Sequence, residues 1–181
     1  MIWARRDRSK QGSAAFGAGR AEDPSAAVSR AKTLSEHGDV EGARSAYQQA
    51  IDSRHPEHAP AAAFSLGLLL GKHGDWAGAQ AGYWYAANSG HPEYAPLAAR
   101  NIGHLFKRQG RFRQAREAYQ LAIDSGHPDV APWAMVYLGN LFIHYRNPAG
   151  AEACYQSAAE SRHPEAAQQA AKRLEALRDA R

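Results

Sequence analysis

One short motif, Ser-x-His-Pro, recurs four times in the chain, and each copy begins 36 residues after the last. Its histidines are His55, His91, His127 and His163. The interval divides the chain into four adjacent units that each open with proline: 24–59, 60–95, 96–131 and 132–167. Periods of 20 to 50 residues are typical of stacked supersecondary units, each of which buries its apolar face against its neighbours. We therefore predict a solenoid of four similar units.

The pattern inside each unit predicts two helices joined by a tight turn. The units are rich in alanine, the best helix former, and the chain lacks strand signatures, so the fold class is all-α. Small, bulky and aromatic residues recur at offsets of three, four and seven, which places them on one helix face. We expect glycines such as Gly38 and Gly74 to end the first helices, and Asp39, Asp75 and Asn147 to cap the second.

The repeated positions resemble the tetratricopeptide repeat. Unit position 8 is small, position 11 is bulky, positions 20 and 27 are alanine and position 24 is tyrosine, as in Gly103, Phe106, Ala115, Tyr119 and Ala122. The unit has 36 residues. This length and the Gly-His-Pro-Glu sequence in the second unit also give it some likeness to Sel1-like repeats. The resemblance implies an α-solenoid of four helix-turn-helix repeats over residues 24–167.

The two ends of the chain differ from the repeats. Residues 168–181 align as one further first helix, in which Leu174 keeps the inward position while Glu175 and Arg178 replace apolar or small residues. We predict that this segment is a C-terminal capping helix, because a repeat stack needs a polar end. Residues 1–23 contain five basic and three acidic residues, and we expect them to form a flexible basic arm.

The four histidines are predicted to be structural. A zinc ion needs ligands about 2.0–2.1 Å away, whereas equivalent atoms of stacked helices lie roughly 8–10 Å apart. The repeat therefore separates the histidines too widely to share an ion, and we expect no metal site and no cofactor. We predict that each imidazole instead hydrogen-bonds a free backbone carbonyl at the end of the preceding helix.

Composition and motifs argue against several functional classes. The chain has no phosphate-binding glycine loop and no Gly-x-Ser-x-Gly elbow, and no Cys–His pair is placed by the repeat register, so we predict that it is not an enzyme. A lone cysteine, Cys154, fits a reducing compartment, and no apolar stretch is long enough to span a membrane. We expect a bacterial cytoplasmic protein, and we expect that this protein does not bind a membrane.

The family resemblance implies a concave groove lined by the first helices, and a non-enzymatic scaffold or adaptor that binds a peptide or protein segment there. The positions that face a ligand in the family carry apolar, basic and hydrogen-bonding residues here, which suit an acidic and apolar partner. The predicted groove residues are Phe64, Leu68, Arg100, Asn101, His104, Lys107, Val136 and Asn140.

Two alternatives remain open from the sequence. A nucleic acid or another anionic polymer would bind the basic arm together with the basic residues of the third unit: Arg100, Lys107, Arg108, Arg111 and Arg113. Alternatively, Trp84 and Tyr85 break the repeat at positions that we expect on the convex surface, where they would form an interface between copies of the chain in a homo-oligomer.

Overall fold

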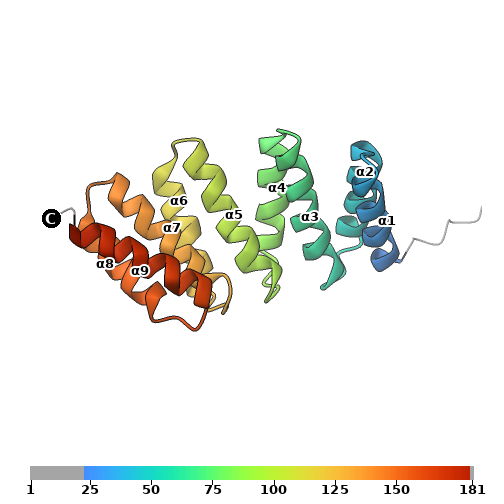
Figure 1. The fold of residues 1–181 in the computed structure, drawn as a ribbon. Coiled ribbons are helices and arrows are strands. Elements are labelled where there is room, and N and C mark those ends of the chain that lie inside the picture. The colour runs from blue at the N-terminus through green and yellow to red at the C-terminus, as the bar shows by residue number, and fades with distance from the viewer. Residues whose placement is uncertain (1–22, 180–181) are drawn as a thin grey trace, which may run out of the picture.

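The computed structural model describes residues 23–179, which form helices and no strand. The nine helices of this range follow one another as a row of hairpins with one unpaired helix at the end (Figure 1). Their bounds are α1 Pro24–Glu36, α2 Val40–Asp52, α3 His58–Lys72, α4 Trp76–Ala87, α5 Tyr94–Arg108, α6 Phe112–Asp124, α7 Ala131–His144, α8 Pro148–Ala159 and α9 Pro164–Asp179. The all-α solenoid is thereby confirmed.

The curvature of the stack follows from which helices touch. Each hairpin packs a first helix (α1, α3, α5 or α7) on a second helix (α2, α4, α6 or α8), and each second helix packs on the next first helix. Some helices within residues 23–179 also pack on the next helix but one. These pairs are α1 with α3, α3 with α5 and α7 with α9, and all of them are first helices. The first helices therefore lie on the inner side of the curve.

The turns inside the hairpins are built as the sequence predicts. Gly38 and Gly74 have φ of 81° and 82°, the left-handed conformation that ends the first helix. The Asp39 side chain then accepts a bond from the Gly42 amide at 2.9 Å, and Asp75 accepts one from Gly78 at 2.8 Å. Asn147 caps α8 in the same way. These three turns thus satisfy backbone groups that the helix ends leave free, whereas Arg111 at the start of α6 forms no such side-chain cap.

The closest helix contacts occur where a glycine of the first helix meets a tyrosine of the second. A Cβ atom added to Gly67 would lie 2.7 Å from the Tyr83 ring, and Gly103 and Gly139 face Tyr119 and Tyr155 in the same way. These tyrosines are buried. The small residue at unit position 8 therefore makes room for the aromatic ring that fills the hairpin.

The Ser-x-His-Pro motif joins one hairpin to the next, and here our prediction for the imidazole was wrong. The serine hydroxyl donates to the carbonyl of the preceding helix, as from Ser89 Oγ to the Ala86 oxygen at 2.7 Å. The histidine bonds the start of the following helix instead, because His91 Nδ1 accepts the Glu93 amide at 3.1 Å and the amide of Tyr94, the first residue of α5, at 3.3 Å. The serine hydroxyl already binds the carbonyl of the preceding helix, so the imidazole is left to accept the amides that follow it in the chain.

A second bond of the histidine links neighbouring junctions. His91 Nε2 lies 3.1 Å from Glu57 Oε2, and His127 Nε2 lies 3.0 Å from Glu93 Oε2. In each pair the carboxylate belongs to the junction one repeat earlier. Two of the four regular histidines, His91 and His127, thereby form a ladder that links three successive junctions.

The helices that follow the junctions begin slightly earlier than the unit boundaries imply. Pro60 and Pro96 are the third residues of α3 and α5, and Pro132 is the second of α7. This is possible because the amides of the first turn need no partner within the helix, so proline is tolerated there. The final helix α9 begins at Pro164, four residues before the segment predicted to form it.

Helix α9 buries one stripe against the last hairpin. Its Ala170 and Leu174 pack in one cluster with Tyr155 of α8 and Val136 of α7. Glu175 and Arg178 are exposed. The predicted basic arm lies outside the described residues except for Asp23, which caps α1 by accepting the Ser25 amide at 3.0 Å.

Candidate functional site

The inner face, defined here as the exposed side of α3, α5 and α7, carries positive charge without a compensating acid. These three helices contain four basic residues and no aspartate or glutamate. The acidic residues of the same repeats lie on the second helices, in the junctions and in one hairpin turn, for example Glu117, Glu93 and Asp75. An acid-free wall of this kind attracts anionic groups.

Half of the predicted groove residues lie together on α5. Arg100 and Asn101 are half-buried and Lys107 is exposed. Within residues 23–179, neither Arg100 nor Lys107 forms an ion pair with a carboxylate. Both cations therefore remain available to a ligand.

His104 lies between these two cations but is held inside the packing. Its Nδ1 lies 2.9 Å from the Tyr119 hydroxyl, and its ring meets the Tyr137 ring edge-on at 4.5 Å. Burial, followed by the charges of Arg100 and Lys107, lowers the pKa of His104 from 6.5 to about 4. The imidazole is therefore neutral at pH 7 and forms a hydrogen bond with the tyrosine hydroxyl.

The corresponding position of the next hairpin has the same function. Asn140 Oδ1 accepts a bond from the Tyr155 hydroxyl at 2.8 Å. His104 and Asn140 are thus both partners of the buried tyrosine of their own hairpin. Part of their hydrogen-bonding capacity is used within the fold, so they form the floor of the inner face rather than its most accessible groups.

The structure adds two aromatic residues that the sequence reasoning did not name. Trp133 and Tyr137 of α7 stack with ring centroids 5.9 Å apart. Both are half-buried, and Tyr137 contacts the His104 ring. The signal was present in the sequence, because the equivalent positions of the other repeats carry no aromatic residue.

The apolar part of the inner face lies on α3. Leu68 is 47% exposed, a large fraction for a leucine. Phe64 is half-buried, with its ring centroid 5.8 Å from those of Tyr83 and Tyr94. The inner face therefore passes from apolar on α3 to basic on α5 and aromatic on α7.

Val136 does not belong to this surface, which corrects its assignment to the groove. It is only 2% exposed and packs with Tyr155 and Leu174. Unit position 5 faces the contact with neighbouring helices. Val28, which has this position in the first repeat, is also buried. Only the longer side chains at this position, Phe64 and Arg100, reach beyond the helix contacts.

The aromatic pair of α4 is divided between the packing and the surface. Trp84 is half-buried against the core, with its ring centroid 6.5 Å from that of Phe106. Tyr85 is 40% exposed. The two residues therefore do not form a fully exposed anchor, although both line one hollow near the end of α4.

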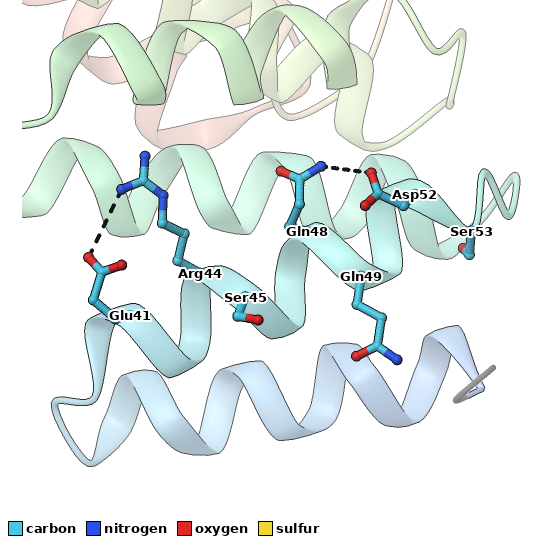
Figure 2. Close-up of a pocket in the computed structure, with 7 residues that line it drawn as sticks. All are labelled: Glu41, Arg44, Ser45, Gln48, Gln49, Asp52 and Ser53. Carbon is cyan, nitrogen blue, oxygen red and sulfur yellow. Dashed lines mark hydrogen bonds and ion pairs between the residues drawn. The ribbon is translucent and has the colours of Figure 1, made fainter. Parts of the chain in front are cut away.

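A hollow along α2 shows what an ordinary repeat presents on its outer side (Figure 2). Its side chains bind one another: Gln48 Nε2 donates to Asp52 Oδ1 at 2.8 Å. Arg44 pairs with Asp75 of the next turn at 3.3 Å and lies 4.0 Å from Glu41. The polar groups of this hollow are thus largely satisfied within the protein.

The described residues show no cluster suited to binding a metal ion. No group of three or more histidine, cysteine or acidic side chains within residues 23–179 is placed to hold a metal ion. Burial raises the pKa of the Cys154 thiol, which disfavours the nucleophilic thiolate. Of the helices in this range, none combines the length and the hydrophobicity that crossing a membrane requires.

Comparison with known families decides the classification. A model described as a tetratricopeptide repeat-like domain matches residues 18–142. The chain belongs to the tetratricopeptide repeat-like family. This match confirms the resemblance that the repeat positions carry, while the likeness to Sel1-like repeats finds no such support. No curated protein has a sequence that matches the chain.

Solved structures of tetratricopeptide repeat proteins share the fold at low identity. BtubC (BKLC) from P. vanneervenii has a TM-score of 0.66 at 19% identity, and the match covers 83% of this chain and 69% of that one. A tetratricopeptide repeat protein from Parabacteroides merdae has a TM-score of 0.65 at 20% identity, covering 87% and 60%. PilF from Pseudomonas aeruginosa has a TM-score of 0.64 at 18% identity, covering 86% and 69%.

Proposed function

We propose that the chain is a non-enzymatic scaffold or adaptor that binds a segment of a partner protein on its inner face. The tetratricopeptide repeat-like fold supports a protein-interaction role in general. The observation that carries the finer proposal is the composition of α3, α5 and α7, which hold four basic and no acidic residues beside the exposed Leu68 and half-buried aromatic rings.

The chemistry of this face selects an acidic segment with an apolar anchor. Arg100 and Lys107 would pair with carboxylates, since neither has one within the described chain. Leu68 and Phe64 would receive an aliphatic or aromatic side chain on the neighbouring helix. Binding in this mode needs an extended or helical segment that spans adjacent first helices.

The structure offers less support for binding of an anionic polymer. Of the basic residues of the third repeat, Arg108 lies over the Trp76 ring at 3.9 Å and Arg111 lies over the Phe106 ring at 4.5 Å. Arg113 pairs with Glu117 at 3.4 Å. Three of the five basic residues that would contact phosphates are thus engaged within the protein.

An immobilised peptide array that varies acidic and apolar content tests the proposal. Peptides that combine both features should be retained by the wild type and lost with Arg100→Glu/Lys107→Glu. The matched control is Arg113→Glu/Arg116→Glu on α6, which makes the same change in net charge on a second helix. Equal loss in both variants would show only a response to net charge, and undiminished capture by the first variant would remove the inner face as the site.

A further inference from the structure

Two residues that break the repeat, Trp84 and Tyr85, meet Arg54 in one hollow outside the inner face. The hollow, of about 620 Å³, lies between the α2–α3 junction and the C-terminal part of α4. Arg54 lines it where the next two junctions have Gly90 and Gly126; the fourth unit has Arg162 there, but without the positive φ of Arg54. Trp84 and Tyr85 line it where α6 has Gln120 and Leu121. Because packing in a repeat protein is shared by all units, departures that converge on one place indicate a function of that place.

The backbone of Arg54 is unfavourable for an arginine. Its φ is 54°, in the left-handed region that Gly90 and Gly126 occupy at 71° and 65°. A side chain at such a position strains the backbone, whereas glycine does not. The Arg54 side chain is exposed and forms no ion pair within residues 23–179. The arginine is therefore not explained by the packing of the junction.

The hollow also lacks the carboxylate that the flanking repeats carry at the same place. In α2 and α6 a glutamine donates to an aspartate one turn later: Gln48 to Asp52 and Gln120 to Asp124, both at 2.8 Å. Figure 2 shows the first of these pairs. In α4 the equivalent residues are Trp84 and Asn88, so the acid is replaced by a neutral amide of the same shape.

The acidic residues on either side of Arg54 in the sequence are already engaged. Asp52 accepts the bond from Gln48, and Glu57 Oε2 lies 3.1 Å from His91 Nε2. The residues that line the hollow therefore supply a guanidinium and no carboxylate. Its charge complements an anionic group brought by a ligand.

His55 adds a second donor at the rim. Its Nδ1 accepts the Glu57 amide at 3.2 Å, so in the neutral imidazole Nε2 carries the hydrogen. In His91 and His127 the Nε2 atom is bonded to a glutamate 34 residues earlier in the chain. The residue at that distance from His55 is an alanine, which cannot accept the bond. Within residues 23–179, His55 Nε2 therefore has no glutamate partner of this kind, and its donor remains for another acceptor.

We propose that this hollow is a second binding site, which takes a segment of a partner protein with an aromatic or aliphatic side chain next to a carboxylate. The apolar side chain packs on Trp84, Tyr85 and Pro60. The carboxylate binds the Arg54 guanidinium and His55 Nε2. Since α4 and the junction build this site, it is separate from the inner face, and one copy of the chain can hold two segments at once.

The test uses the full chain labelled with ¹⁵N and a hexapeptide in which phenylalanine precedes glutamate in a glycine–serine background. Titration to about 1 mM should shift the amide resonances around Arg54, Trp84 and Asn88 in a saturable way. A peptide with glutamine in place of glutamate should bind about tenfold more weakly, because it loses the charge-assisted bonds.

Two variants keep the fold while removing the proposed recognition. Arg54→Gly restores the residue of the neighbouring junctions, so its melting temperature should stay equal or rise while its affinity falls about tenfold. Asn88→Asp restores the carboxylate of α2 and α6 and should weaken binding to a similar extent by occupying Arg54 and repelling the ligand. Arg100→Gln/Lys107→Gln should bind the hexapeptide as the wild type does, which separates this site from the inner face.

Several results would overturn the proposal. Binding that is unchanged in both Arg54→Gly and Asn88→Asp, or shifts confined to α5 and α7, would exclude the hollow as the site. Absence of saturable shifts in the wild type would do the same. Concentration-dependent sedimentation of the wild type that Trp84→Gln/Tyr85→Leu abolishes, without peptide binding, would assign the hollow to contact between copies of this chain instead.

Discussion

The ring of Tyr119 lies against the α-carbon of Gly103 so closely that a methyl group added there would overlap the ring. Tyr119 has no exposed surface, so it has little room to move. The same pairing of a first-helix glycine with a second-helix tyrosine recurs in the second and fourth hairpins. In these three hairpins the close approach of the two helices therefore depends on a glycine, which has no side chain to meet the ring.

This contact predicts opposite effects for two glycine-to-alanine changes in first helices. Gly103→Ala should lower the free energy of unfolding by about 1–3 kcal/mol, because the added methyl group forces the packed ring to shift. Gly71→Ala is the control, since its nearest contact would be an ordinary 3.6 Å to the Ala79 Cβ. It should stabilise the protein by up to about 1 kcal/mol through helix propensity. Urea unfolding followed by circular dichroism measures both, and equal effects would contradict the explanation.

A second prediction concerns the ladder of histidines and glutamates. His127→Ala removes both the acceptor of the Asp129 amide in the turn before α7 and the bond to Glu93, so it should cost about 1–2 kcal/mol of unfolding free energy. Glu93→Ala removes only the link, and because Glu93 is exposed it should cost less than about 1 kcal/mol.

The double variant isolates the link. If His127 and Glu93 interact as the structure shows, the two losses should not add, and thermal unfolding of both single variants and the double variant should give a coupling of about 0.5–1 kcal/mol. Strict additivity would mean that the two side chains do not stabilise each other in solution.

The features that the sequence predicted well are those that lie within one repeat. The caps Asp39 and Asp75 and the close approach at Gly103 each depend on residues of a single hairpin, whose spacing along the chain is short. The repetition multiplies each signal and makes the solenoid readable from the 36-residue period alone.

The features that were missed depend on how neighbouring hairpins sit on one another. The bond from His127 to Glu93 joins residues 34 positions apart, and it forms only at the rotation that the stacked hairpins adopt. Val136 and Trp84 were expected on surfaces but meet the adjacent hairpin or helix instead. Periodicity assigns a residue to a helix face but does not say how far the next unit covers that face.

The final helix provides a third prediction. Leu174 of α9 is 9% exposed and packs with Tyr155, which belongs to the last hairpin. Leu174→Ala should cost about 2 kcal/mol or more, because it removes buried apolar volume at the end of the stack. Leu177→Ala is a control on the same helix at a half-buried position and should cost less. A wild-type melting temperature for Leu174→Ala would mean that α9 does not stabilise the repeats.

His104 predicts how stability depends on pH. Its pKa in the folded protein is lowered to about 4, mainly by burial and then by Arg100 and Lys107, from an ordinary value of 6.5. The unfolded chain therefore binds a proton between these two values that the folded chain excludes. The contribution of this group to the free energy of unfolding is fully present above pH 6.5. It is lost progressively as the pH falls to about 4, by up to about 3 kcal/mol.

The matched variant for this effect is His104→Asn, because Asn140 already accepts the tyrosine hydroxyl at the same position of the next hairpin. The variant should keep the bond to Tyr119 and lose the proton linkage. Urea unfolding at a series of pH values should give a shallower fall in stability between pH 6.5 and 4 than in the wild type. Parallel curves for the two proteins would show that His104 protonates as readily in the folded state as in the unfolded chain, and that the inner face gains a positive charge there in mild acid.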